Sequence, residues 1–184
     1  MQRQAHAGGL SVADVGRRTE RLAPLLERLS TASDSLLELR PAVESGSPWP
    51  LSKSIGVEPE AHWGPPEVLA HVAEMLPFWL GEIERVIAGA DEPVPFGRVA
   101  TDQLRIGVIE RDRSLPPREL FDRVASDVGR YRRRLGELDH AAVGKRGLHA
   151  IRGELTIAEM LERFATSHLE EHVEQLRETL AGSR

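Results

Sequence analysis

The sequence predicts an all-α protein in which four long helices pack as a bundle, within a single domain over residues 1–184. Four long stretches carry apolar residues at helical spacing, and no segment alternates apolar and polar residues over a useful length. A chain of 184 residues is long enough to bury one apolar core. Four amphipathic helices bury their apolar faces most simply by packing against one another.

The first helical stretch covers residues 12–39, with leucines at helical spacing through most of its length. Pro24 lies inside it, so the helix is either kinked there or a new helix begins near this residue. The connection that follows, residues 44–66, is rich in Pro, Gly and Ser. It is long for a loop between bundle helices, and such long loops are often functional.

The second helix is expected to begin at Pro65 or Pro66, because proline is tolerated in a first helical turn. Its apolar face extends to Val86, and Pro77 lies within it as the site of a bend. A second connection rich in Pro and Gly follows, and it contains a short helix over residues 104–110.

The third helix opens at the string PPREL and carries an apolar stripe from Leu120 to Leu138. The last helix begins near Thr156, where the string Thr-Ile-Ala-Glu predicts a capping box. Its apolar residues continue at helical spacing to about Leu180.

The composition excludes several classes of protein. The net charge of −5 offers no basic surface for nucleic acid. The absence of cysteine excludes disulfides, thiolate metal sites and a cysteine nucleophile, and it suits a reducing cytoplasm. No apolar run has the length of a membrane helix, and the N-terminus lacks the apolar segment of a signal peptide. We therefore expect a cytoplasmic protein that binds neither nucleic acid nor membranes.

Three of the seven histidines stand out by their position. His168 and His172 are four residues apart on the last helix, so both imidazoles lie on one face and can reach one ion. The pair is not the HExxH motif of zinc proteases, because Leu169 occupies the place of the glutamate. His71 lies on the core side of the second helix, among apolar residues three and four positions away.

Each of these histidines alone is more simply a partly buried side chain, hydrogen-bonded to a backbone carbonyl. Three inward-facing imidazoles need partners for several buried nitrogens, however, and one shared metal satisfies all of them. Three protein ligands leave a coordination position for water or substrate, which is typical of catalytic sites. Imidazole suits zinc, nickel, iron or copper. The sequence therefore predicts a divalent metal held by His71, His168 and His172.

Three other residues are candidates for the surroundings of this metal. Glu74 lies three positions after His71 and Glu171 three after His168, so either carboxylate can orient a ligand. The alternative for each is a solvent-facing helix glutamate. His149, just before the last helix, is either at the mouth of a substrate site or a loop histidine exposed to water. No catalytic residue is assigned beyond the metal centre.

Two strings in the sequence resemble a known family. Residues 63–72, WGPPEVLAHV, place a tryptophan before a helix that carries a histidine. Residues 153–176, GELTIAEMLERFATSHLEEHVEQL, place a glycine and a hydroxyl residue before a helix with two histidines four apart and a glutamine after them. In these two strings and in their order along the chain, the sequence resembles the DinB-like (YfiT-like) superfamily.

The resemblance implies an up-and-down four-helix bundle with an extra short helix, frequently as a homodimer. It also implies a divalent metal, commonly nickel or zinc, at His71, His168 and His172. Characterised members of that superfamily include transferases that use low-molecular-weight thiols such as mycothiol or bacillithiol, and a mycothiol-dependent maleylpyruvate isomerase.

The leading functional hypothesis is therefore a metal-dependent enzyme that transfers such a thiol to a small electrophilic substrate, or catalyses a related isomerisation. The thiol has to come from a cofactor, because the chain contains no cysteine. One alternative is a metal-dependent hydrolase that uses the same three histidines. Another is a non-catalytic bundle that binds metal or a partner.

Overall fold

The protein is mostly helical over the residues that its structure, a computed structural model, describes: 12–53, 55–56, 60–90 and 93–182. Residues 1–11, part of the N-terminal stretch in which we found no signal peptide, lie outside these ranges. The helical elements, in chain order, are α1 (Val12–Glu38), α2 (Arg40–Ser45), the 3-10 turn η1 (Glu60–His62), α3 (Pro65–Ala88), α4 (Gln103–Asp112), α5 (Pro117–Gly136), α6 (His140–Gly144), α7 (Ile157–Leu161), the π-helical turn η2 (Glu162–Thr166) and α8 (Ser167–Gly182). None of the helices in these ranges has the length and apolar character needed to cross a membrane.

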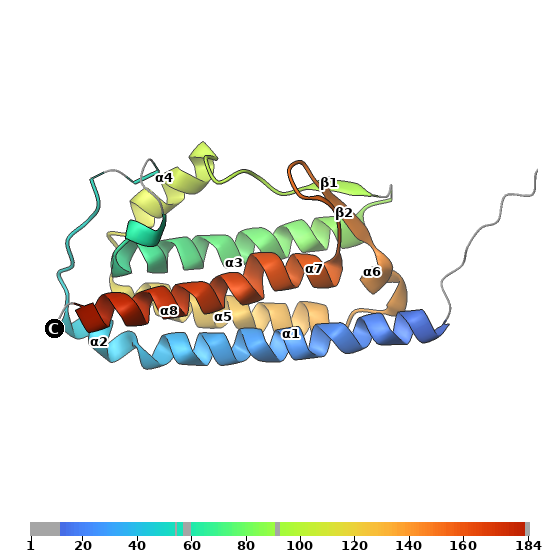
Figure 1. Ribbon diagram of the computed structural model, residues 1–184, viewed down its shortest axis with the longest axis horizontal. Coiled ribbons are helices and arrows are strands. Elements are labelled where there is room, and N and C mark those ends of the chain that lie inside the picture. Colours follow the sequence, from blue (N-terminus) through green and yellow to red (C-terminus); the bar gives the residue numbers. More distant parts are fainter. Residues whose placement is uncertain (1–11, 54, 57–59, 91–92, 183–184) are drawn as a thin grey trace, which may run out of the picture.

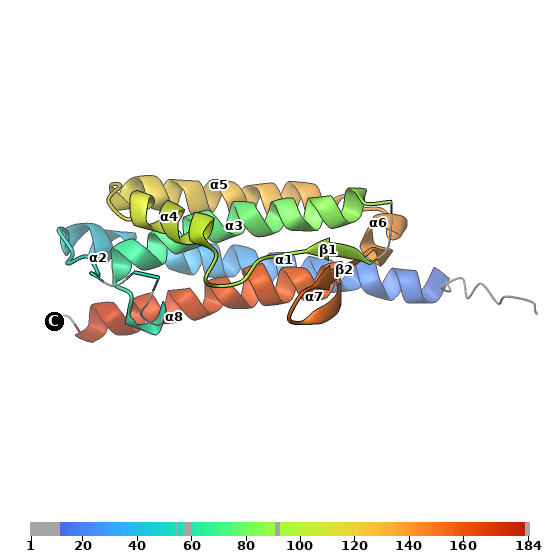
Figure 2. The same ribbon diagram turned by 90° about the horizontal axis from the view of Figure 1, so that it is seen from above.

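The long helices lie side by side along the length of the molecule (Figure 1 and Figure 2). α5 packs against α1 and α3, and α8 packs against the same two helices from the other side. Because α7, η2 and α8 follow one another without a break, they form one long helical segment. The apolar faces of these helices form one buried cluster, and its largest fully buried members include Leu29, Leu36, Leu69, Leu76, Phe121 and Tyr131. Burial of each such leucine side chain stabilises the folded state by roughly 1.5–3 kcal/mol relative to leaving it in water.

The helix starts expected from the sequence are confirmed, whereas α5 ends at Gly136, before Leu138, and the last helix contains the π-helical turn η2. α1 runs without interruption through Pro24, so no new helix begins there. The side chain of Pro24 is exposed. α3 begins at Pro65, and α4 occupies the place of the expected short helix. Thr156 forms the predicted capping box at the start of α7: its hydroxyl accepts a hydrogen bond from the Glu159 backbone N–H, and the Glu159 carboxylate accepts one from the Thr156 N–H.

The expectation that the all-α chain contains no sheet is wrong. β1 (Val94–Phe96), β2 (Arg146–His149) and β3 (Gly153–Thr156) form a sheet in the order β1-β2-β3. β1 is parallel to β2, with Phe96 opposite His149, and β2 is antiparallel to β3. Strands of three or four residues are too short to show alternation in a sequence. Both β1 and β2 pack against α3.

Candidate metal centre

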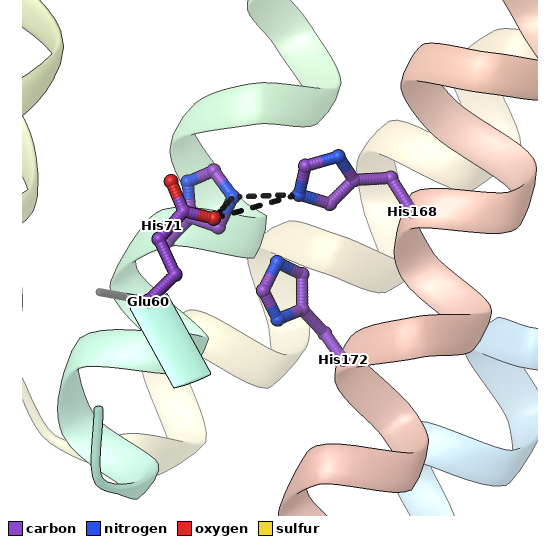
Figure 3. A group of neighbouring side chains, drawn as sticks. All are labelled: Glu60, His71, His168 and His172. Carbon is purple, nitrogen blue, oxygen red and sulfur yellow. Dashed lines mark hydrogen bonds and ion pairs between the residues drawn. The ribbon is translucent and has the colours of Figure 1, made fainter. Parts of the chain in front are cut away.

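The three predicted histidines converge between two helices. His71 lies in the second turn of α3, and His168 and His172 lie in the first turns of α8, which packs against α3 (Figure 3). One ligand atom from each ring and one from the carboxylate of Glu60 all lie within 4.8 Å of one another. His71 and His172 are 2% and 5% exposed, so the group is sheltered from water on its inner side. These four residues can hold a metal ion.

The ring nitrogens face one another with too few protons and partners to satisfy them all. Nε2 of His71 lies 3.1 Å from Nε2 of His168. The Nε2 atom of His172 is buried, points toward the other two rings (Figure 3), and has no hydrogen-bond partner among the described residues. An unpaired buried nitrogen costs roughly 1–3 kcal/mol. A bound cation would take the lone pairs of all three rings, so the residues present fit a metal.

Burial keeps the three imidazoles neutral. Desolvation, followed by the nearby His172 and Arg105, lowers the pKa of His168 to about 3. The pKa of His71 is held well below its ordinary value, chiefly by burial. Burial also lowers the pKa of His172, although its hydrogen bond to Gln175 acts in the opposite direction. At neutral pH each ring therefore has the uncharged form in which an imidazole nitrogen binds a metal.

Gln175 determines which nitrogen of His172 is free. The side-chain amide of Gln175 donates a hydrogen bond to the backbone carbonyl of Glu60, at 2.7 Å. Its oxygen must then accept the proton of His172 Nδ1, at 2.9 Å, which leaves the lone pair on Nε2. Such a partner orients a metal-binding histidine and fixes its tautomer. This glutamine belongs to the string of residues 153–176 that carries the family resemblance, but the sequence alone indicates no role for it.

Glu60 is the member of the group that sequence reasoning missed. Its Oε2 atom lies 3.8 Å from Nε2 of His71 and 4.0 Å from Nε2 of His168. It belongs to the long first connection, where the available signal was the length of the loop rather than any residue pattern. Its other carboxylate oxygen pairs with Arg105, in the first turn of α4.

Arg105 also contacts His71. Its Nη2 atom lies 3.3 Å from Nδ1 of the ring, and a guanidinium can only donate, so Nδ1 accepts and Nε2 bears the proton. A metal at Nε2 requires the opposite tautomer, with the proton on Nδ1. Arg105 would then keep its other two partners, the carboxylate of Glu60 and the carbonyl of Ala100.

The two glutamates that were expected near the ligands, Glu74 and Glu171, have different surroundings. Glu74 forms an ion pair of 2.5 Å with Arg98, whose guanidinium lies 3.6 Å from the centre of the Phe78 ring. Among the described residues no hydrogen bond or ion pair joins Glu74 to His71. Glu171 is exposed and lies beside the outer side of the group, where its charge raises the pKa of His172.

His149 is buried rather than exposed in a loop. It ends β2 with 5% exposure, and its Nδ1 accepts hydrogen bonds from the N–H groups of Ile151 (3.2 Å) and Arg152 (3.4 Å). Its ring stacks on Phe164 at 5.5 Å between centroids. Burial lowers the pKa of His149. Its ring contributes to the lining of a pocket that also contains His71 and His168.

Two openings of opposite charge meet at the four residues. We call the first the arginine pocket: it has a volume of about 270 Å³, and its lining includes His71, His168, Glu60, Arg98, Arg105, Arg152 and Arg163. We call the second the glutamate face: it is a surface depression of about 470 Å³ whose lining includes His168, His172, Glu60, Glu171, Glu174 and Glu178. Glu60 and His168 line both.

The helical fold and the clustered histidines define a helical protein with a candidate metal centre between two of its helices. The family model of the DinB superfamily matches residues 16–176, so the chain belongs to the DinB superfamily. Neither a curated protein nor a solved structure matches this chain.

Proposed function

We propose that this DinB-superfamily protein is a metal-dependent enzyme that transfers a low-molecular-weight thiol, of the mycothiol or bacillithiol type, to a small electrophile or catalyses a related isomerisation. The observation that supports this proposal is the convergence of three neutral imidazoles around the unpartnered Nε2 of His172. His71, His168 and His172 would hold the ion, for which nickel and zinc are the leading candidates. The long helical segments would form the up-and-down four-helix bundle that the resemblance implies.

A divalent ion held by three uncharged imidazoles would keep its full charge and would supply the Lewis acidity that lowers the pKa of a thiol or of water. The residues of the chain would bind, orient and protect the reactants. Gln175 orients His172, and Glu60 lies close enough to two rings to accept a proton beside them. Trp79 and Phe164, stacked at 4.1 Å, exclude water from the inner wall of the arginine pocket. The thiol must enter from outside, since the chain has no cysteine.

The proposal is tested first by the metal content of the purified protein, measured by elemental mass spectrometry together with that of a His168→Ala variant. We expect near-stoichiometric nickel or zinc in the native chain and its loss in the variant. His62→Ala is the matched control, because His62 is an exposed histidine outside the group. No metal in either protein, even after reloading, would contradict the catalytic proposal and favour a non-catalytic interaction bundle.

Assays of the loaded protein with and without added thiol then separate the remaining alternatives. Turnover of a panel of electrophiles that depends on mycothiol or bacillithiol supports the transferase. Turnover without thiol would instead identify a hydrolase at the same three histidines. Metal binding without turnover of either kind would leave a metal-binding module.

A further inference from the structure

The arginine pocket combines positive charge with limited volume. Its 270 Å³ lies just below the roughly 300–1,000 Å³ usual for small-molecule sites, so it suits a small ligand. Four arginines line it, against one carboxylate, that of Glu60. Burial of two of these arginines, Arg98 and Arg105, fixes their positions at 12% and 7% side-chain exposure.

The four arginines differ in the charge that remains available to a ligand. Arg98 is neutralised by Glu74, and Arg105 by Glu60. Arg152 and Arg163 are exposed at the mouth, and within the described part of the chain no carboxylate pairs with either of them. A hydrogen bond from the Thr156 N–H lowers the pKa of Glu159, and Arg163 is near enough to lower it further. The two arginines at the mouth are therefore less fully neutralised than Arg98 and Arg105, but they are not isolated from negative charge.

The floor of the pocket is aromatic. Phe164 stacks on Trp79 with 14° between the ring planes, and on His149 with 21°. At the rim, the apolar side chains of Val99 and Ile151 are 43% and 73% exposed. Large apolar side chains left in water around a pocket mark a surface that an apolar ligand group can cover.

The backbone of Arg152 is anchored to this floor. Its backbone N–H and that of Ile151 donate to Nδ1 of His149, so the turn between β2 and β3 is tied to the aromatic stack. The Arg152 guanidinium lies 6.0 Å from the centre of the Phe164 ring. The backbone of Arg152 is therefore fixed beside the aromatic rings, and its exposed guanidinium lies within reach of a ligand on them.

We propose that the arginine pocket binds a small aromatic carboxylate, with its flat apolar body on the floor formed by Trp79, Phe164 and His149 and its carboxylate at Arg152 and Arg163. The proposal rests on the proposed function, since it makes this pocket the substrate site of the candidate metal centre. It goes further by naming the class of substrate: an organic anion with an aromatic body.

The test uses full-length, metal-free protein and two probes of nearly equal shape, 2-naphthoate and its neutral amide 2-naphthamide. Isothermal titration calorimetry should show naphthoate binding at least ten-fold more tightly than the amide. In the Arg152→Gln/Arg163→Gln double variant, naphthoate should bind about ten-fold more weakly, a change of about 1.4 kcal/mol. The affinity for the amide should stay within two-fold.

Arg132→Gln is the matched control, because Arg132 is an exposed arginine on α5 outside the pocket, and this variant should bind naphthoate like the native chain. Equal affinities for the two probes, or unchanged naphthoate binding in the double variant, would overturn the proposal. The removal of metal keeps this test independent of the proposed function. Absence of metal binding with intact naphthoate binding would refute the metal-dependent enzyme alone, and the reverse result would refute the anion site alone.

Discussion

The arginine pocket and the glutamate face share Glu60 and His168 in their linings but carry opposite charge. The pocket is lined by arginines and buried aromatic rings, whereas the face is open to solvent and lined by carboxylates. A region lined by one sign of charge raises the local concentration of ions of the other sign and the rate at which they arrive. The difference suggests a division of access, in which an organic anion approaches from one side and a metal cation from the other.

The largest expected effect concerns the metal itself, at the point where the two openings meet. Nickel or zinc at a free concentration one hundred times its dissociation constant should stabilise the chain by about 2.7 kcal/mol. For a chain of this size that corresponds to a rise in melting temperature of roughly 5–11 °C, measurable by differential scanning fluorimetry. His172→Ala should abolish the shift, because it removes a ring from the group. His62→Ala should retain it, and an equal shift in both variants would place the metal elsewhere.

Replacement of Gln175 tests whether metal affinity depends on the orientation of His172, which lines the glutamate face. Gln175→Leu removes the acceptor of the His172 proton, so we expect metal affinity to fall about 10–100-fold, as measured by competition with a chelator. Gln175→Glu keeps that acceptor and loses only the donor to the Glu60 carbonyl, so its affinity should fall less. Two variants with equal losses would show that the hydrogen bond to His172 is not what matters.

A substitution at Gly97 tests whether the aromatic floor of the arginine pocket is needed for ligand binding. This residue has φ +88°, a region that favours glycine, and an added Cβ would lie 2.5 Å from Cδ2 of His149. Gly97→Ala should therefore lower the free energy of unfolding by about 1–2 kcal/mol in denaturant titrations, and weaken naphthoate binding by displacing the pocket floor. Gly81→Ala is the control, since Gly81 lies inside α3 with no atom within 4 Å of an added Cβ. It should be neutral or stabilising, by up to about 1 kcal/mol.

The smallest expected effect is on the rate of metal uptake. Neutralising two residues of the glutamate face, with Glu171→Gln and Glu178→Gln together, should slow association about two- to five-fold at low salt and less at high salt. Stopped-flow mixing with a metal-sensitive dye would measure this rate. The same measurement on Glu137→Gln, an exposed glutamate at the far end of α5, should give the native rate. A slower rate in the control would mean that only the overall charge matters.

The convergence of the histidines could be predicted because much of it is local. The spacing of His168 and His172 fixes their shared helix face, and the apolar neighbours of His71 place it on the core side. Glu60 and Arg105 could not be predicted in this way. One lies in a loop without periodicity, and the other reaches His71 only because α4 packs against α3. Contacts between distant segments leave no regular spacing in a sequence.

The π-helical turn is a case in which a signal was present but not interpreted. The apolar stripe of the last helix advances by three or four residues at most steps, but by five between Phe164 and Leu169. That interval matches one wider turn, and η2 lies over this point. The wider turn lets the residues before and after it share one buried face. The three short strands, by contrast, left no comparable pattern.

Gln175 connects two distant parts of the chain, since one end of its amide group holds a ring of α8 and the other holds the backbone of η1. An ion bound at the histidines would therefore be thermodynamically coupled to the conformation of the turn at residues 60–62. Coupling of this kind is reciprocal. A molecule that binds one arrangement of the turn more tightly would change the affinity for the ion, and the ion would change the affinity for that molecule by the same factor.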